Sequence, residues 1–279
     1  MNTSTGLKKR YLGSFAMALM AISSISLAQT PTDFETMKKI ISLQQAELKA
    51  LRAIVEQHAQ GNFEGVTLKT KSLKVAESIS AGGDVQSNGN VIATSNIYAG
   101  NTINSEGTIT TQSNVRAEGT IHSDSTISAK GTIFSDKNLQ AKASIYADGS
   151  LVVQKNITAR NTIFSDVNIQ AKGTVFADGN VQAKGSVYAD GAVKADGNLT
   201  AGGNIYSGDQ IQAKGTIFSD VNVQAKGSVY ADGSVNADGN LRAGGDVFAG
   251  DQIQAKGTIF SDKNLQVGGS IFSGGVHRH

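Results

Sequence analysis

One residue in every six along most of this chain is a large aliphatic. From Leu73 to Ile271, every sixth position holds Ile, Val or Leu, with no insertion or deletion. The residue two positions later is nearly always small, as at Ala81 and Ser87. Because side chains alternate between the two faces of a strand, this spacing predicts a short strand whose aliphatic and small residues both face inward.

The rest of each six-residue unit has the composition of a corner. Four positions after the aliphatic the residue is most often Gly, as at Gly83 and Gly185, and the next is Asn, Thr, Ser or Asp. Glycine accepts positive φ and the polar residues cap their own backbone, so both favour turns. A strand and a corner every six residues are typical of a parallel β-solenoid, whose stacked turns bury one continuous aliphatic column. The only proline, Pro31, precedes the repeats, which fits because proline would interrupt the hydrogen bonds between turns.

Charged residues at the corners favour three strands per turn. With three hexads per turn Lys130 stacks with Asp148, and opposite charges prevail in this column; with two hexads per turn Lys130 stacks with Lys142, and like charges prevail. Neighbours about 4.8 Å apart sense this difference, although an exposed pair contributes less than about 1 kcal/mol. Aromatic residues that recur after two hexads, as Phe134 and Tyr146 do, favour the two-sided turn instead. The opposite-charge pairs expected for the three-sided turn include Lys130–Asp148, Arg160–Asp178, Asp166–Lys184 and Lys214–Asp232.

We therefore predict an all-β fold over residues 62–273: a parallel β-solenoid in the form of a triangular β-helix with about 18 residues per coil. A longer period lies over the hexads. The segments GTIFSDKNLQAK, GTVFADGNVQAK, GTIFSDVNVQAK and GTIFSDKNLQ begin at residues 131, 173, 215 and 257, which are 42 positions apart. This period indicates internal duplication in whole hexads, which preserves the register of the solenoid.

Residues 29–61 predict one coiled-coil α-helix before the solenoid. Thr32 is a plausible N-cap with Glu35 three residues on, and Gly61 ends the segment. A helix packed within its own domain is the alternative, because a second apolar stripe runs through Leu43 and Ile54. The strict alternation of three and four residues favours an oligomerisation seam. The predicted seam consists of Phe34, Met37, Ile41, Gln44, Leu48, Leu51, Val55 and His58.

Residues 1–28 predict a cleavable signal peptide. A basic segment, Lys8 to Arg10, precedes an apolar segment from Leu12 to Leu27, and cleavage is expected before Gln29. An uncleaved membrane anchor is the alternative, but the apolar segment is short for the roughly 20 residues that a span needs. We expect the mature protein outside the cytoplasm: secreted, at the cell surface or in the periplasm. No transmembrane span is expected after cleavage. Residues 274–279 are expected to form a disordered tail.

Composition and charge exclude several classes of function. The chain has 279 residues with 32 glycines, no cysteine and a formal charge of +2. Without cysteine there are no disulfides and no thiolate chemistry. The near balance of charge gives no sign of a nucleic-acid partner.

The sequence offers no catalytic, cofactor-binding or metal site. Only four histidines occur, and His122 falls on an outward strand position, where a plain surface residue is the simpler interpretation. The Ala-Asp-Gly corners, such as that at Asp148, could suggest calcium, but the nonapeptide calcium repeat is absent. A threonine-rich ice-binding face is disfavoured because residues such as Thr108 and Thr120 fall in corners. We predict that the protein is not an enzyme and uses no cofactor.

The hexads, such as SIYADGSL at residues 144–151 and GNLTAGGNI at residues 197–205, resemble the β-helical core of bactofilins and the repeats of bacterial surface fibres. The resemblance covers about 200 residues and is one of repeat pattern. It implies a triangular β-helix that polymerises end to end without enzyme activity. Two features depart from bactofilins, which are cytosolic with short disordered flanks: the signal peptide and the coiled coil predicted here.

Two hypotheses for function follow. In the first, the chain is an exported structural protein that assembles with copies of itself into an extracellular or cell-surface fibre or matrix. In the second, the coiled coil holds a discrete trimer, and the protein is a stalked adhesin or binding module for a surface or matrix polymer.

Overall fold

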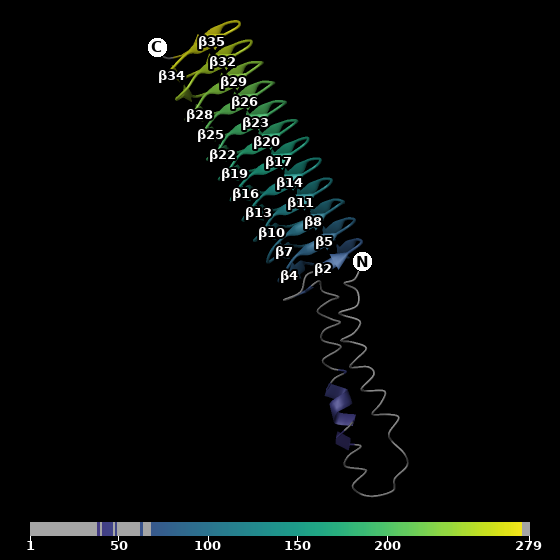
Figure 1. The fold of residues 1–279 in the computed structure, drawn as a ribbon. Helices are drawn as coiled ribbons and strands as arrows, with labels where there is room; N and C mark the ends of the chain where they lie inside the picture. Colours follow the sequence, from purple (N-terminus) through teal and green to yellow (C-terminus); the bar gives the residue numbers. More distant parts are fainter. Residues whose placement is uncertain (1–37, 40, 47, 49–61, 64–67, 275–279) are drawn as a thin grey trace, which may run out of the picture. The chain divides into compact units, whose positions relative to one another are not determined.

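The computed structural model describes residues 38–39, 41–46, 48, 62–63 and 68–274. The chain divides into two compact units, Met1–His58 and Ala59–His279. In the first unit, residues 38–39, 41–46 and 48 are helical. The second unit is a parallel β-solenoid, and its turns follow one another from β4 to β35 (Figure 1).

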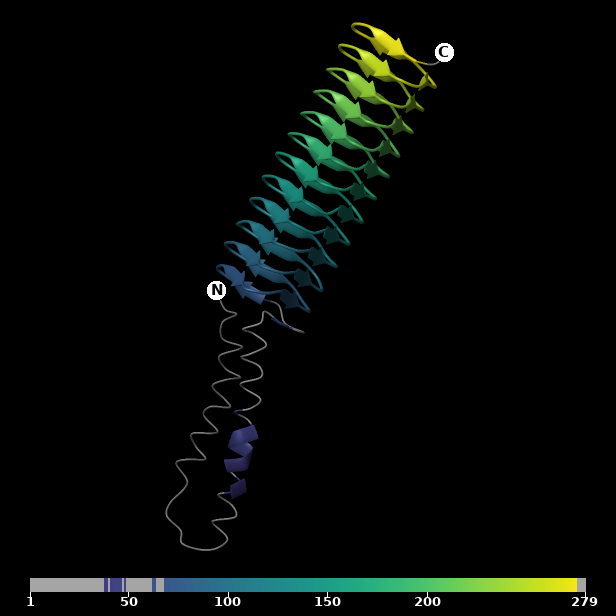
Figure 2. The same ribbon diagram turned by 180° about the vertical axis from the view of Figure 1, so that it is seen from behind.

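Three parallel sheets of 12 strands each form the faces of the solenoid, and the chain passes through them in rotation (Figure 2). Sheet A contains β1 (Asn62–Phe63), β4 (Ile79–Ala81), β7 (Ile97–Ala99), β10 (Val115–Ala117), β13 (Ile133–Ser135), β16 (Leu151–Val153), β19 (Ile169–Ala171), β22 (Val187–Ala189), β25 (Ile205–Ser207), β28 (Val223–Ala225), β31 (Leu241–Ala243) and β34 (Ile259–Ser261).

Sheet B contains β2 (Leu68–Thr70), β5 (Val85–Ser87), β8 (Ile103–Ser105), β11 (Ile121–Ser123), β14 (Leu139–Ala141), β17 (Ile157–Ala159), β20 (Val175–Ala177), β23 (Val193–Ala195), β26 (Ile211–Ala213), β29 (Val229–Ala231), β32 (Val247–Ala249) and β35 (Leu265–Val267). Sheet C contains β3 (Leu73–Val75), β6 (Val91–Ala93), β9 (Ile109–Thr111), β12 (Ile127–Ala129), β15 (Ile145–Ala147), β18 (Ile163–Ser165), β21 (Val181–Ala183), β24 (Leu199–Ala201), β27 (Ile217–Ser219), β30 (Val235–Ala237), β33 (Ile253–Ala255) and β36 (Ile271–Ser273).

The pairing register confirms the triangular turn of three hexads. Ile127 pairs with Ile145, and Ser128 pairs with Tyr146, so each residue lies beside the one three hexads later. The two-sided alternative is therefore excluded, and aromatic residues two hexads apart lie on different faces. The charges at the corners were the better guide to the number of strands per turn.

The aliphatic column is the core of the solenoid. The inward aliphatic of each strand from β4 to β33 has an exposed fraction of 0–1%. Most strands bury their first and third residues and expose or half-bury the second, as the alternation predicted. Burying each such side chain contributes about 1.5–3 kcal/mol. Stacking is required for this, because a single turn would leave both sides of its aliphatic row open to water.

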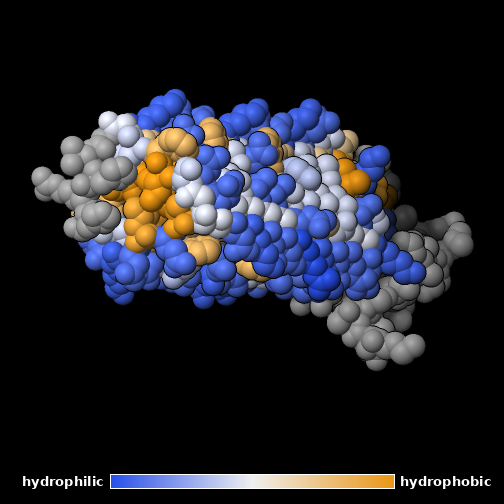
Figure 3. Space-filling model, turned by 90° about the horizontal axis from the view of Figure 1, so that it is seen from above, coloured by the Kyte–Doolittle hydropathy of each residue, from blue (hydrophilic) through white to orange (hydrophobic). Residues whose placement is uncertain are grey.

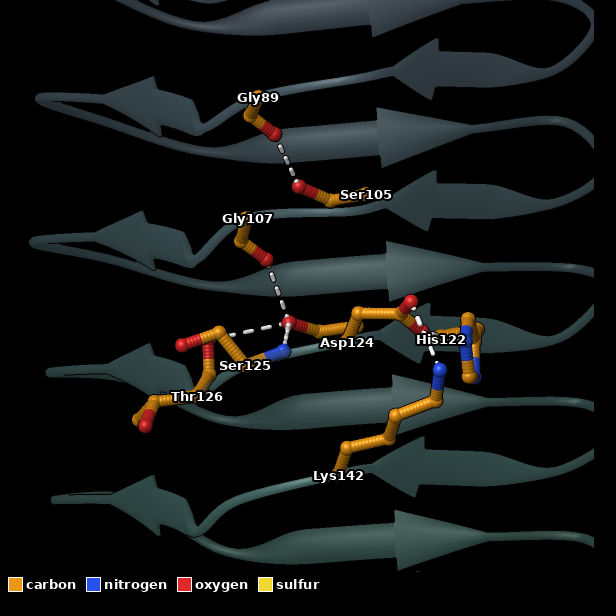
Figure 4. A network of polar contacts seen from close by, with 9 residues as sticks. Gly89, Ser105, Gly107, His122, Asp124, Ser125, Thr126 and Lys142 are labelled. Atoms are coloured by element: carbon orange, nitrogen blue, oxygen red, sulfur yellow. Dashed lines mark hydrogen bonds and ion pairs between the residues drawn. The ribbon is translucent and has the colours of Figure 1, made fainter.

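Serine at the small inward position adds a hydrogen bond between turns (Figure 4). Ser105 Oγ donates to the carbonyl oxygen of Gly89 at 2.6 Å, and Ser123 Oγ donates to that of Gly107 at 2.6 Å. Ser123 Oγ also accepts the backbone N–H of Ser125 at 3.0 Å. These bonds satisfy a hydroxyl that would otherwise be costly to bury.

Asparagine at the corners forms a second link between turns. Asn114 Oδ1 accepts the backbone N–H of Thr132 at 2.7 Å, and Asn156 Oδ1 accepts that of Thr174 at 2.8 Å. The amide side chain therefore takes the place of a backbone partner where the strand pairing stops. This bond accounts for the frequency of Asn at the last position of the hexad.

The corner glycines were expected to allow a left-handed backbone, but the structure shows a close approach between turns instead. Gly100 and Gly149 have no left-handed φ, so the expectation of positive φ was wrong at these positions. A Cβ atom added at Gly149 would lie 2.7 Å from the carbonyl carbon of Gly131, one turn earlier, and one added at Gly100 would lie 2.3 Å from the carbonyl oxygen of Gly82. With the backbone as it stands at these two glycines, a side chain would meet the preceding turn, so the backbone there would have to shift; the same corner one turn after Gly149 accommodates Val167.

Candidate functional site

The outward residues of the strands carry three pairs of neighbouring aromatic rings, one pair on each face. Tyr188 and Tyr206 on sheet A are stacked, with ring centroids 4.8 Å apart and ring planes 11° apart. The other pairs are tilted, with centroids separated by 6.4 Å and 6.3 Å: Tyr146–Phe164 on sheet C and Tyr230–Phe248 on sheet B. Sequence reasoning considered aromatic recurrence only across two hexads and missed these pairs, although their three-hexad spacing was present in the sequence.

Further phenylalanines contact arginine. The guanidinium carbon of Arg116 lies 5.0 Å from the centroid of the Phe134 ring, and that of Arg242 lies 5.2 Å from the centroid of Phe260. Both pairs lie on sheet A, where each arginine is one turn before its phenylalanine. Such cation–π contacts contribute about 0.5–1 kcal/mol at exposed sites.

Ion pairs join successive turns at the corners, as the three-hexad register predicted. Lys184 Nζ lies 2.8 Å from Asp166 Oδ2, which is one of the expected pairs. Lys214 Nζ lies 2.5 Å from Asp196 Oδ2, one turn earlier. Asp232, which was expected to stack with Lys214, does lie one turn later in the same register, but the closer ion pair is with Asp196. The hydrogen bond to Asp196 raises the pKa of Lys214. These pairs are exposed to solvent and contribute little to stability.

Of the other expected ion pairs, the described residues show neither Lys130–Asp148 nor Arg160–Asp178. Two more lysine–aspartate pairs also join residues three hexads apart: Lys142–Asp124 and Lys256–Asp238. The register was thus predicted correctly, and one of the four expected opposite-charge stacks, Asp166–Lys184, is an ion pair. Which neighbours in a column form an ion pair depends on side-chain rotamers at the corner, which the spacing alone leaves open.

His122 belongs to a small charged cluster on sheet B (Figure 4). Its Nε2 lies 2.8 Å from Asp124 Oδ1, and Lys142 Nζ lies 2.8 Å from Asp124 Oδ2. The hydrogen bond from Lys142, followed by that from His122, holds the pKa of the Asp124 carboxyl below its ordinary value. The cluster lies on an outer face, and no group of three or more potential metal ligands occurs among the described residues. His122 lies on an outward strand position, as the sequence predicted, but its pairing with Asp124 was not predicted.

Two shallow hollows adjoin the stacked tyrosines on sheet A. One has a volume of about 440 Å³, and the side chains around it include Gln170, Lys172, Ser186, Tyr188 and Asp190. The other has a volume of about 330 Å³ and is lined by residues that include Tyr188, Asn204, Tyr206 and Gln224. The hydrogen bond between Tyr188 and Asp190 raises the pKa of the tyrosine. Both hollows mix one or two aromatic rings with amide and hydroxyl groups.

The last strands β34, β35 and β36 form the open edge of the three sheets within the described residues. Ile271 and Phe272 on β36 have exposed fractions of 37% and 54%, whereas the inward aliphatics of β4 to β33 are fully buried. Leu265 and Val267 on β35 are only partly buried. Figure 3 shows hydrophobic surface gathered towards one end of the solenoid, while much of the remaining surface in that view is hydrophilic.

Three residues of the predicted seam fall within the described part of the helix. Ile41 and Leu48 have exposed fractions of 52% and 51%, and Gln44 is half-buried. Leu43, from the second apolar stripe, is also exposed at 59%. The remaining seam residues lie outside the described residues: Phe34, Met37, Leu51, Val55 and His58.

Comparisons with known proteins add no identity. No family model, curated protein or solved structure matches the chain. Among the described residues, no helix is long and apolar enough to cross a membrane.

Proposed function

We propose that this chain is an exported structural protein that assembles end to end with copies of itself into a fibre or matrix outside the cytoplasm. The observation that supports the proposal is the open edge formed by β34, β35 and β36, where Ile271 and Phe272 are exposed. An edge of unpaired strands is a template for pairing with another chain. The proposal assigns the protein no catalytic role.

The arrangement of the sheets favours head-to-tail growth. Each sheet contains the same number of strands, 12, and all strands of a sheet run in the same direction. A second copy moved along the axis would therefore place its β1, β2 and β3 on β34, β35 and β36 of the first. Such a contact joins two different surfaces and does not close on itself, so it generates an open filament.

The apolar residues at the two ends support the same contact. Leu73 and Val75 on β3, at the N-terminal edge, are partly buried, as are Leu265 and Val267 at the C-terminal edge. Stacking would bring these groups into the continuous aliphatic column and bury the exposed face of Ile271. Removing apolar surface from water stabilises the contact by about 25 cal/mol per Å².

Electron microscopy of the purified protein tests the proposal. The chain would be produced with its own leader in a bacterium, recovered from outside the cytoplasm, and imaged alongside a light-scattering measurement of mass. We expect filaments, and a mature N-terminus at Gln29. A protein that remains a small discrete species at high concentration would refute assembly into a fibre.

A matched pair of variants makes the test specific to the end surface. Ile271→Asp places a carboxylate in the proposed contact, where an unpaired charge is costly to bury, and should abolish filaments. Val167→Asp alters an aliphatic of similar exposure, 42%, at a corner far from the ends and should leave filaments intact. Equal behaviour of the two variants would count against the end-to-end contact.

A second candidate is a trimeric stalked adhesin held together by the helix, and the exposed Ile41 and Leu48 support it. If the predicted seam is correct, Leu48→Asp should reduce a three-chain mass to that of one chain, whereas Leu43→Asp, on the other stripe, should not. Uniform particles of three-chain mass would favour this candidate over the fibre. Unchanged mass in both variants would exclude the seam.

A further inference from the structure

The 42-residue copies differ in an uneven way on the outer surface. Each copy contributes seven strands, and the middle residue of each strand points outward. At the fourth strand this residue is Val152, Lys194 or Asn236 in successive copies, so the solenoid accepts an aliphatic, a cation or an amide there. Folding of the solenoid therefore does not require a particular residue type at this outward position.

Other outward positions keep their chemistry in the copies that begin at residues 131, 173 and 215. The first strand keeps Phe, the second Gln, the third Tyr, the sixth an aromatic and the seventh Gln. These are Phe134, Phe176 and Phe218; Gln140, Gln182 and Gln224; Tyr146, Tyr188 and Tyr230; Phe164, Tyr206 and Phe248; and Gln170, Gln212 and Gln254. In contrast to the fourth strand, these positions therefore present the same kinds of side chain in all three copies.

The solenoid brings four of the retained positions into one column. A copy holds seven strands and a turn holds three. The seventh strand of one copy therefore pairs with the third strand of the next copy. By the same spacing, the sixth strand of any copy pairs with the second strand of the copy that follows it. On sheet A the column reads Gln170, Tyr188, Tyr206 and Gln224 on four successive strands. The two rings at its centre are the stacked pair, and an amide lies at each end.

The same column recurs on the other two faces. Each copy advances by two turns and one further face, so the next column appears on the next sheet. On sheet B it reads Gln212, Tyr230, Phe248 and Gln266. On sheet C it reads Ser128, Tyr146, Phe164 and Gln182. In each column the first ring is a tyrosine with an exposed fraction of 36–41%.

The surroundings of the first tyrosine are also repeated. Tyr188 is flanked by Ser186 and Asp190 on its own turn and by Lys172 one turn earlier, and all three line the 440 Å³ hollow with it. The corresponding groups around Tyr146 are Ser144, Asp148 and Lys130, and those around Tyr230 are Ser228, Asp232 and Lys214. Each column thus combines exposed aromatic surface, at least one amide, a serine hydroxyl and corner charges of both signs.

This set of groups selects a neutral, polyhydroxylated ligand. The corner charges beside each column are of mixed sign, as with Lys172, Asp190 and Lys226 on sheet A, so no column presents a surface of one sign that would attract a polyanion or a polycation. A pyranose ring has an apolar C–H face that packs on an aromatic ring, and its hydroxyls bond to amides, a carboxylate and an ammonium group. The column spans about 14 Å over its three inter-strand steps, which suits a short stretch of a sugar polymer.

We infer that each column is a binding site for a neutral polysaccharide, and that one solenoid holds three such chains on three faces. A second solenoid fits these columns less well. Each face carries one aromatic pair at a different height, so a straight, rigid partner could meet only one pair at a time. Separate or flexible glycan chains can occupy all three. The inference adds a ligand to the proposed function and needs only that an exported protein meets such polymers.

Calorimetry with neutral hexasaccharides tests the inference on the full-length protein: cellohexaose, chitohexaose, laminarihexaose and maltohexaose, with oligogalacturonate as an anionic comparison. Tyrosine fluorescence gives a second signal, since the chain has no tryptophan. The test variant combines Tyr146→Ala, Tyr188→Ala and Tyr230→Ala. The matched control combines Phe134→Ala, Phe176→Ala and Phe218→Ala, which alters the same outward position on the same three sheets outside the columns.

We expect at least one neutral hexasaccharide to bind with three sites per chain. The tyrosine variant should lose this binding, the phenylalanine variant should keep it, and each single tyrosine variant should lose one site. Absence of binding by every neutral sugar, or equal loss in both triple variants, would overturn the inference. The inference would also be overturned if no sugar binds and the tyrosine variant disrupts assembly, because the columns would then be contacts between copies of the chain. Circular dichroism establishes that each variant is folded, and microscopy of the unaltered protein tests fibre formation separately.

Discussion

The aliphatic column makes a prediction whose size follows from the structure. Ile211 on β26 has an exposed fraction of 0% and pairs with Val193 and Val229 on the turns before and after it. Ile211→Ala removes three carbon atoms from this environment. At about 0.8 kcal/mol per buried methylene, the lost transfer free energy is about 2.4 kcal/mol. The cavity left between the neighbouring turns increases the loss to about 3–4 kcal/mol.

The neighbouring residue provides a control at the same height. Gln212 is exposed on the outer face of the same strand. Gln212→Ala leaves the column intact, so the free energy of unfolding should change by no more than about 0.5 kcal/mol. Both variants keep the backbone pairing of β26, and their difference isolates the inward side chain.

Guanidinium denaturation followed by far-ultraviolet circular dichroism measures both changes. We expect the transition midpoint to fall clearly for Ile211→Ala and to stay close to that of the unaltered chain for Gln212→Ala. Equal losses in the two variants would refute the assignment of inward and outward positions. A small loss for Ile211→Ala alone would mean that adjacent turns collapse onto the cavity, and that the column is less rigidly packed than its burial implies.

Two further predictions concern the corners. Gly149→Ala should destabilise the solenoid by about 1–3 kcal/mol, because the new Cβ would meet the backbone of the preceding turn. Val167→Ala, at the same corner one turn later, should change the stability little. Thermal unfolding compares the two variants, and equal losses would contradict the explanation by close approach. In the second, Lys142→Ala should raise the pKa of Asp124 towards its ordinary value, since Lys142 lowers it more than His122 does. A depressed folded-state pKa stabilises the fold above the ordinary carboxyl pKa, and this contribution is lost as pH falls through the folded value. Carboxyl-carbon NMR titration of both proteins measures the shift, and an unchanged pKa would exclude the ion pair.

The sequence by itself determined which residues lie inside. The six-residue period placed Ile127 and Ile145 in the column and Ser128 and Tyr146 outside it, as their burial confirms. This was predictable because strand alternation is a local property, and an unbroken period leaves no choice of register. The corner charges also favoured the turn of three hexads, which the three sheets confirm.

Only the tertiary structure decided what lies beside what. Tyr188 and Tyr206 form a stacked pair because the turn length places them on neighbouring strands, and the sequence shows this only after the turn length is known. The partner of Lys214 depends on corner rotamers, which carry no sequence period. The close contact that a side chain at Gly149 would make arises from the distance between turns and not from its own φ, so it too is a property of the stacked solenoid. Local alternation therefore fixes the faces of each strand, and stacking fixes the contacts on which a binding surface depends.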